Sequence, residues 1–131
     1  MNSPEQVPAE EKLARYVFQS NHLRQDGTVK PDAFVPHPKA NLSVTRHIGL
    51  NEGQLRDIGI HIAVQRQKRL LGRSDINASA FLSQGLRVLS APVAGNPNHA
   101  NVEDWPTDKA AQKSIAQQIA LIAGKAYLYS G

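Results

Sequence analysis

The order of periodic segments constrains the fold of this chain more than any other feature of its sequence. Only two stretches have a helical pattern, and short segments with strand character lie before, between and after them. A regular alternation of strands and helices would indicate a parallel sheet, whereas grouped strands indicate an α+β fold. We therefore predict an α+β fold with a small mixed or antiparallel sheet of about five to six short strands and two main helices.

The two helices are predicted from their end signals. Asn51 is a good N-cap, Gln54 follows at the spacing of a capping box, and Gly72 is the expected residue just beyond the C-terminus. The second helix is predicted over 107–123, ended by Gly124. Its expected core-facing stripe consists of Ala111, Ile115, Ile119 and Ile122.

The remaining ordered segments have strand character. They are predicted over 13–20, 33–35, 42–46, 76–82, 86–90, 99–102 and 127–129. The segments 76–82 and 86–90 flank a three-residue loop that ends in glycine, which is typical of a β-hairpin. In 42–46, the alternation turns Leu42 and Val44 toward the core and puts Arg46 on the same side. A guanidinium there must be paired or line a cleft, because burying it alone is too costly.

The ends and composition of the chain indicate where it resides. Residues 1–10 are predicted to be a flexible lead-in, followed by a single domain over 11–131. No apolar run approaches the roughly 18 residues of a membrane span, and the acidic first residues lack the apolar region of a secretory signal. The chain has no cysteine, which excludes disulfides and thiolate metal sites. We expect a cytoplasmic protein without membrane contact, metal or cofactor.

The charge of the chain is unevenly distributed. The formal net charge is +4, and residues 12–73 carry eleven cations against four acidic residues. Such a basic excess is typical of a polyanion partner, although solvated surface cations alone can also produce it. The hypothesis that follows is a basic cleft for nucleic acid, a nucleotide or an acidic protein surface. Its candidate ligand-binding residues are Arg15, His22, Arg24, Arg46 and Arg73.

Enzymatic chemistry is indicated only weakly. The sequence contains no phosphate-binding loop, nucleophile elbow or zinc-binding helix motif, and its histidines lack the spacing of a metal-ligating pair. A loop over 92–98, stiffened by prolines, precedes His99 and could hold that side chain in place. If the strands at 42–46 and 99–102 are neighbours, His99 and Arg46 would share one polar site. A small hydrolase or group transferase would then use His99 as general base, with Arg46 holding an anionic group.

Three segments carry a resemblance to known sequences: "LSVTRH" at 42–47, "GRSDI" at 72–76 and "NPNHANVEDWPTDKAAQ" at 96–112. On these segments the chain resembles a group of small uncharacterised bacterial proteins. The resemblance implies a single compact domain and a bacterial origin, and it implies no activity. The favoured hypothesis is therefore a non-enzymatic binding or accessory module for an anionic ligand. A protein–protein interaction or oligomerising domain comes second, and the enzyme comes third, with its catalytic residues unknown.

Overall fold

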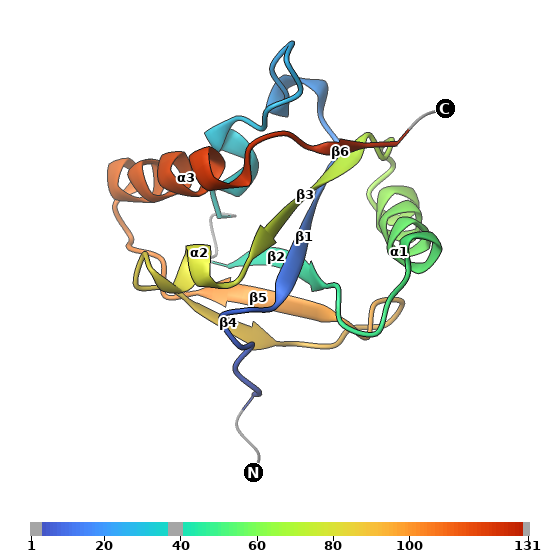
Figure 1. The fold of residues 1–131 in the computed structure, drawn as a ribbon, viewed down its shortest axis with the longest axis horizontal. Helices are drawn as coiled ribbons and strands as arrows, with labels where there is room; N and C mark the ends of the chain where they lie inside the picture. The colour runs from blue at the N-terminus through green and yellow to red at the C-terminus, as the bar shows by residue number, and fades with distance from the viewer. Residues whose placement is uncertain (1–3, 37–40, 130–131) are drawn as a thin grey trace.

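Six strands form one open antiparallel sheet with the order β4-β5-β2-β1-β3-β6 (Figure 1). The computed structural model describes residues 4–36 and 41–129. The strands are β1 (Lys12–Val17), β2 (Leu42–Arg46), β3 (Gly72–Asn77), β4 (Arg87–Ser90), β5 (His99–Glu103) and β6 (Tyr127–Leu128). The α-helices are α1 (Glu52–Gln65), α2 (Ser79–Leu82) and α3 (Lys109–Ala123), and two 3-10 helices are η1 (Ser20–His22) and η2 (Pro31–Phe34). The predicted α+β class, with one small sheet and two main helices, is confirmed.

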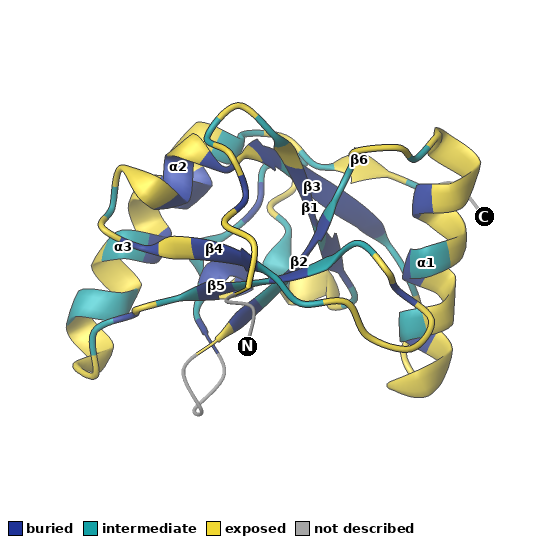
Figure 2. Ribbon diagram, turned by 90° about the horizontal axis from the view of Figure 1, so that it is seen from below, coloured by how far each residue is buried: buried dark blue, intermediate teal, exposed yellow. Residues whose placement is uncertain are grey.

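The two main helices lie on opposite sides of the sheet (Figure 1). The hydrophobic core lies on the α3 side, where Phe34, Phe81 and Ile119 are fully buried in one cluster. On the other side, α1 buries only Leu55, Gly59 and Ala63, and most of its surface is exposed (Figure 2). The α1 face of the sheet therefore has thinner packing, and this face holds the polar groups described below.

The first helix begins as predicted but ends earlier. Both hydrogen bonds of the capping box are present, from the Gln54 amide to the Asn51 side chain at 2.8 Å and from the Asn51 amide to the Gln54 side chain at 2.9 Å. The prediction that Gly72 ends this helix is wrong, because the chain already turns at Gln67, which has φ of 54°. Gly72 instead opens β3, where the Tyr127 carbonyl leaves no room for a side chain.

The predicted hairpin over 76–90 is wrong. β3 pairs with β1 along its whole length, and β4 pairs with β5. The apolar alternation over 76–82 belongs partly to β3 and partly to the single turn of α2, where the Leu82 amide donates to the Ala78 carbonyl at 3.1 Å. Such a short alanine-rich segment fits a helical turn as well as a strand, so the period alone cannot assign it.

The predicted strand over 33–35 is also wrong, since this segment lies in η2 and its exit. Pro31 occupies the first position of η2, where a missing amide hydrogen leaves no bond unmade. Ala33 and Phe34 are buried in the core cluster, in contact with α3. The apolar residues between the prolines therefore contribute to the core without joining the sheet.

Residues 5–9 of the predicted lead-in pack on the domain. The Val7 amide donates to the Val88 carbonyl at 2.9 Å, and the Ser90 amide donates to the Glu5 carbonyl at 2.8 Å. Val7 itself belongs to the core cluster. This segment covers the edge of β4, which would otherwise offer unpaired backbone groups. Residues 1–3 of the predicted lead-in lie outside the described residues.

The buried face of α3 differs from the predicted stripe. Ile119 is fully buried, but Ile122 is 60% exposed. The buried residues Ala116 and Ala120 place the core-facing side about a quarter turn away from the predicted stripe, at 100° per residue. Alanines allow the helix to approach the core closely, so the packed face follows these small side chains and turns Ile122 outward.

Candidate anion-binding site

A pocket lies between α1 and the sheet, and we refer to it as the α1 pocket. It encloses about 160 Å³. The second half of α1 forms one wall, strands β1, β2 and β5 form the floor, and the loop before β5 closes the third side. Its polar and aromatic lining residues are Arg15, Tyr16, Phe18, Ser43, Thr45, His61, Gln65, Arg66, Asn96 and His99.

The lining of the α1 pocket contains two arginines and two histidines but no aspartate or glutamate. Arginine supplies several N–H donors and no acceptor, and imidazole can also carry a positive charge. The local field therefore favours an anion. Apolar walls from Ile62 and Val93 lower the polarity around these groups, which strengthens such an interaction relative to bulk water.

Arg15 lines the pocket next to the part of β1 that pairs with β2. The printed register pairs β1 with β2 only at Leu13–Arg46 and Ala14–Thr45. Beyond these pairs, the Arg15 guanidinium donates from Nε to the Ala33 carbonyl and from Nη1 to the Ser43 carbonyl, each at 2.9 Å. No carboxylate of the described residues pairs with it.

The charge of Arg15 is costly where it lies. Burial and, to a smaller extent, the positive charge of Arg66 lower the pKa of Arg15 to about 10. This value is still well above neutral pH, so the guanidinium stays protonated. Two main-chain carbonyls accept hydrogen bonds from two of its five N–H groups, but a carbonyl carries no net negative charge. An anion in the pocket would neutralise the positive charge of the guanidinium.

His99 is held in one tautomer by its backbone contact. Its Nδ1 lies 2.7 Å from the Ala91 carbonyl, which can only accept, so Nδ1 carries a hydrogen. In the neutral ring Nε2 is then an acceptor, and in the charged ring it is a donor. Among the described residues, Nε2 has no hydrogen-bond partner, so no hydroxyl or carboxyl group is hydrogen-bonded to the ring. A general-base role would need such a contact to a nucleophile or substrate.

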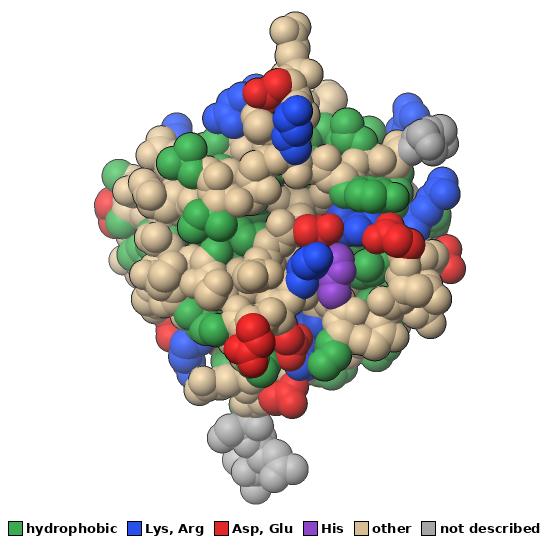
Figure 3. Space-filling model, viewed as in Figure 1, with side chains coloured by type: hydrophobic (Ala, Val, Ile, Leu, Met, Phe, Trp, Pro, Cys, Tyr) green, Lys and Arg blue, Asp and Glu red, His purple; other side chains and the backbone are tan. Residues whose placement is uncertain are grey.

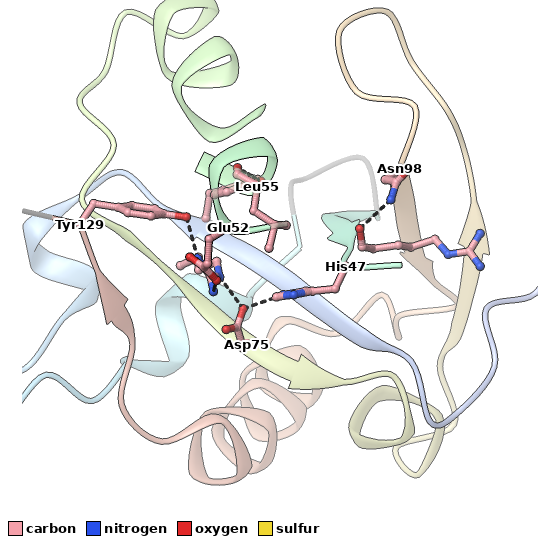
Figure 4. Close-up of polar contacts among 9 residues, drawn as sticks. His47, Glu52, Leu55, Asp75, Asn98 and Tyr129 are labelled. Atoms are coloured by element: carbon pink, nitrogen blue, oxygen red, sulfur yellow. Dashed lines mark hydrogen bonds and ion pairs between the residues drawn. The ribbon is translucent and has the colours of Figure 1, made fainter. Parts of the chain in front are cut away.

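Two asparagines fix the loop that closes the pocket. Asn96 is 2% exposed, and its Nδ2 donates to the Thr45 hydroxyl at 2.8 Å. Asn98 donates to the carbonyl of Arg46 (Figure 4) and to the carbonyl of Ile48. At Gly95, which has φ of 81°, any side chain would collide with the ring of His61. The loop is therefore anchored to β2 and lies directly against α1.

A second polar cluster lies outside the pocket and is internally saturated (Figure 4). Arg73 is 3% exposed and donates to both oxygens of Glu52, to Asp75 and to the Tyr129 hydroxyl. His47 Nε2 lies 2.8 Å from the same Asp75 carboxylate. Figure 3 shows a histidine among acidic and basic side chains on the corresponding face of the molecule. Because each guanidinium nitrogen already has an acceptor, this cluster ties α1 and the C-terminal segment to β3.

The pKa values of the two acids in this cluster reflect their partners. Burial opposes ionisation of Asp75, but the hydrogen bonds from His47 and Arg73 outweigh it and lower the pKa of that carboxyl. The hydrogen bonds from Arg73 lower the pKa of Glu52 despite a small opposing effect of burial. Both acids are therefore ionised at neutral pH, and their charges neutralise Arg73.

Arg46 and His99 do not form the predicted shared site. β2 and β5 are neighbours, which was the condition for a shared site, but His99 lies opposite Thr45, so Arg46 points to the other face of the sheet. There the Arg46 guanidinium forks both oxygens of Glu11 and also pairs with Glu5. The expectation that an inward arginine must be paired is confirmed, and its partners come from the first eleven residues.

The other predicted residues are divided between the pocket and its surroundings. Arg15 and His99 line the pocket, whereas Arg73 belongs to the saturated cluster. Arg24 lies at a turn, where it donates to Thr28 and to the Val29 carbonyl at 3.3 Å each. Burial and the nearby charge of Arg15 lower the pKa of His22. His22 and Arg24 are not among the residues that line the pocket.

Sequence reasoning missed His61 and Arg66, two of the four pocket residues that α1 and its C-cap supply. A lone histidine on a helix carries no motif, and a basic residue near a helix C-terminus is already explained by the helix dipole. The available signal was their spacing with Ile62 and Gln65, which places all four on adjoining helical positions. The aromatic Phe18, over which Arg66 lies at 5.4 Å, completes this side.

Comparisons with protein-family models, curated proteins and solved structures give no match to this chain. Within residues 4–36 and 41–129, no group of three or more histidines and acidic residues is arranged to hold a metal ion. No helix in this part of the chain has the length and apolar character needed to cross a membrane. The functional argument therefore depends on the geometry and charge of the α1 pocket.

Proposed function

We propose that this protein is a small non-enzymatic binding module whose α1 pocket takes a compact anionic ligand. The observation that carries the proposal is Arg15, a partly buried guanidinium without a carboxylate partner among the described residues, in a pocket lined by no acidic residue. Arg66 and the two histidines supply further donors around the same space. A phosphate or carboxylate group would accept charge-assisted hydrogen bonds from these groups.

The dimensions of the pocket favour a small ligand over an extended polyanion. A cavity of about 160 Å³ suits an anionic group with a short apolar body, which Tyr16 and Phe18 would contact. Three arginines that could have contributed to a broad basic surface, Arg46, Arg73 and Arg87, are instead paired with carboxylates. Nucleic acid, the other ligand predicted from the charge of the chain, would need several such cations on one continuous face.

The enzyme hypothesis has less support in the pocket. Arg46 cannot hold a substrate for His99, because the two side chains lie on opposite faces of the sheet. The Thr45 hydroxyl accepts a hydrogen bond from Asn96 and is not hydrogen-bonded to His99. A binding role uses all the pocket groups as they lie, whereas acid–base catalysis would need a further partner for His99.

Calorimetric titration with phenyl phosphate, inorganic phosphate and benzoate at low salt would test the proposal. Phenyl phosphate should bind best, because it supplies both the anion and the short apolar body. Arg66→Ala should weaken its binding about ten- to hundredfold, the effect of losing a charge-assisted hydrogen bond. Arg24→Ala is the matched control, since it removes the same charge outside the pocket and should change the dissociation constant less than about twofold.

Arg15 also supports the sheet, so its variant needs a fold check. Arg15→Ala should lose binding, and circular dichroism should show whether the secondary structure persists. His99→Ala provides a second pocket variant that leaves the Arg15 hydrogen bonds in place. Absence of binding by all three small anions, or equal weakening by Arg66→Ala and Arg24→Ala, would refute the proposal. Binding of a DNA duplex with a steep salt dependence would favour the nucleic-acid alternative.

A further inference from the structure

The outer side of α1 carries a second surface, separate from the α1 pocket, which we refer to as the outer groove. It encloses about 210 Å³. Its floor is apolar, with Ile60 and Val64 from the helix and Leu70 from the segment that follows. Ile60 is 41% exposed and Val64 is 70% exposed. In Figures 1 and 2 this helix stands at the outside of the sheet with an exposed outer surface.

The rim of the outer groove is positively charged. Arg56, Lys68 and Arg69 line it, and the lining includes no acidic residue. The two acidic residues of α1, Glu52 and Asp57, are not among its lining residues, and Glu52 is held by Arg73. The surface therefore combines exposed aliphatic side chains with three cations that have no ion pair among the described residues.

The apolar surface continues past the end of the groove. A neighbouring hollow, which Glu52 and Gly53 also line, shares Arg56 and Tyr129 with it and adds Tyr127 and Leu128 of β6. These two side chains are 49% and 53% exposed. A contiguous apolar surface with a polar rim is typical of a protein interaction site, whereas single exposed apolar residues are ordinary.

We infer that the outer groove docks an acidic amphipathic helix of a partner protein. Its apolar face would cover Ile60 and Val64, and its acidic residues would meet Arg56, Lys68 and Arg69. A helix laid along α1, whose 14 residues extend about 21 Å, would span the whole surface. This pairing satisfies both properties of the groove, the exposed aliphatic floor and the uncompensated positive rim.

Charge decides against a second copy of the chain as the occupant. In a twofold symmetric dimer the same patch occurs on both sides, so the cations of one groove would face those of the other. Like charges placed opposite each other across an interface are strongly unfavourable. The exposed aliphatic side chains of Ile60 and Val64 also favour a protein partner over single-stranded nucleic acid, whose bases stack on aromatic side chains.

Fluorescence anisotropy with a defined probe would test this inference. The probe is a labelled 16-residue helical peptide, a length of about 24 Å, with leucines on one face and glutamates on the other. It should bind saturably, and Val64→Glu should weaken binding at least about tenfold by placing a carboxylate in the apolar floor. Leu121→Glu is the matched control, because Leu121 is 77% exposed on α3 and should change binding less than about twofold. Both sites are exposed, so both variants should fold.

The outcomes separate the possible occupants. Amide resonances of Ile60, Val64 and Leu70 should shift on titration with the glutamate peptide, and a lysine version of the peptide should produce no such shift. Absence of saturable binding, or equal weakening by Val64→Glu and Leu121→Glu, would overturn the inference. A dimer in sedimentation equilibrium that Val64→Glu dissociates would identify a second copy as the occupant. Binding of a DNA duplex through the same resonances would assign the groove to nucleic acid.

Discussion

At the scale of single residues, the arginines differ in whether a carboxylate neutralises their charge. Arg46 and Arg73 are deeply paired with carboxylates, Arg87 is paired at the surface, and Arg15 has only carbonyl partners among the described residues. From the sequence alone, Arg15, Arg46 and Arg73 are predicted to line one basic cleft. Their partners, such as Glu11 for Arg46, lie far away along the chain, so only the fold distinguishes neutralised arginines from one that could hold a ligand.

Arg46→Lys tests whether the fork to Glu11 matters. Lysine keeps the charge but cannot form two parallel hydrogen bonds to one carboxylate, so the free energy of unfolding should fall by about 1–2 kcal/mol. Arg87→Lys is the control, because its pair with Asp104 is exposed and the substitution should leave the free energy of unfolding nearly unchanged. Urea denaturation of both variants gives the comparison, and equal losses would show that Arg46 contributes only a charge.

At the scale of elements, local signals predicted the helices and several strands but not their partners. The capping box predicted the start of α1, and the apolar alternation predicted β2, because each of these signals depends on only a few consecutive residues. The first residues of β3 were not predicted as a strand because Arg73 and Asp75 interrupt its apolar pattern. Their ion pairs with each other and with Glu52 form only in the folded protein. For the same reason, the α1 pocket could be predicted only in part, through Arg15 and His99.

Ile119→Ala tests which face of α3 is buried. Removing this fully buried side chain should lower the free energy of unfolding by about 2–5 kcal/mol, through lost burial and the cavity that it leaves. Ile122→Ala removes the same atoms from a side chain that is 60% exposed and should cost less than about 1 kcal/mol. Chemical denaturation decides between them, and similar losses for both would place the helix in a different rotation from the one described.

At the scale of the whole molecule, the two faces of the sheet have different roles. The α3 face holds the hydrophobic core, whereas the α1 face is joined through the Arg73 cluster and encloses the α1 pocket. Attachment of α1 therefore depends on ionised side chains as well as on packing. This division gives the α1 side two acids, Asp75 and Glu52, whose ionisation couples its packing to pH, and under the proposed function it also binds an anion.

Acid should destabilise the protein through this cluster. The folded-state pKa values of Asp75 and Glu52 lie below their ordinary values, so their stabilising contribution is present above those values. It should be lost as the pH falls below about 4 and through the lowered folded-state values. Urea denaturation from pH 6 to pH 3 should show this loss, and Asp75→Asn should show a shallower dependence on pH. An equally steep dependence in Asp75→Asn would assign the acid response to other carboxyls.

The most direct measurement of the central claim is an NMR titration of the histidine side chains with phenyl phosphate. His61 and His99 line the α1 pocket, whereas His22 and His47 are not among its lining residues. The account predicts saturable shifts of the imidazole resonances of His61 and His99, with much smaller shifts for His22 and His47. Shifts confined to His22 or His47, or no saturable shift of any histidine, would contradict the claim that the α1 pocket binds an anion.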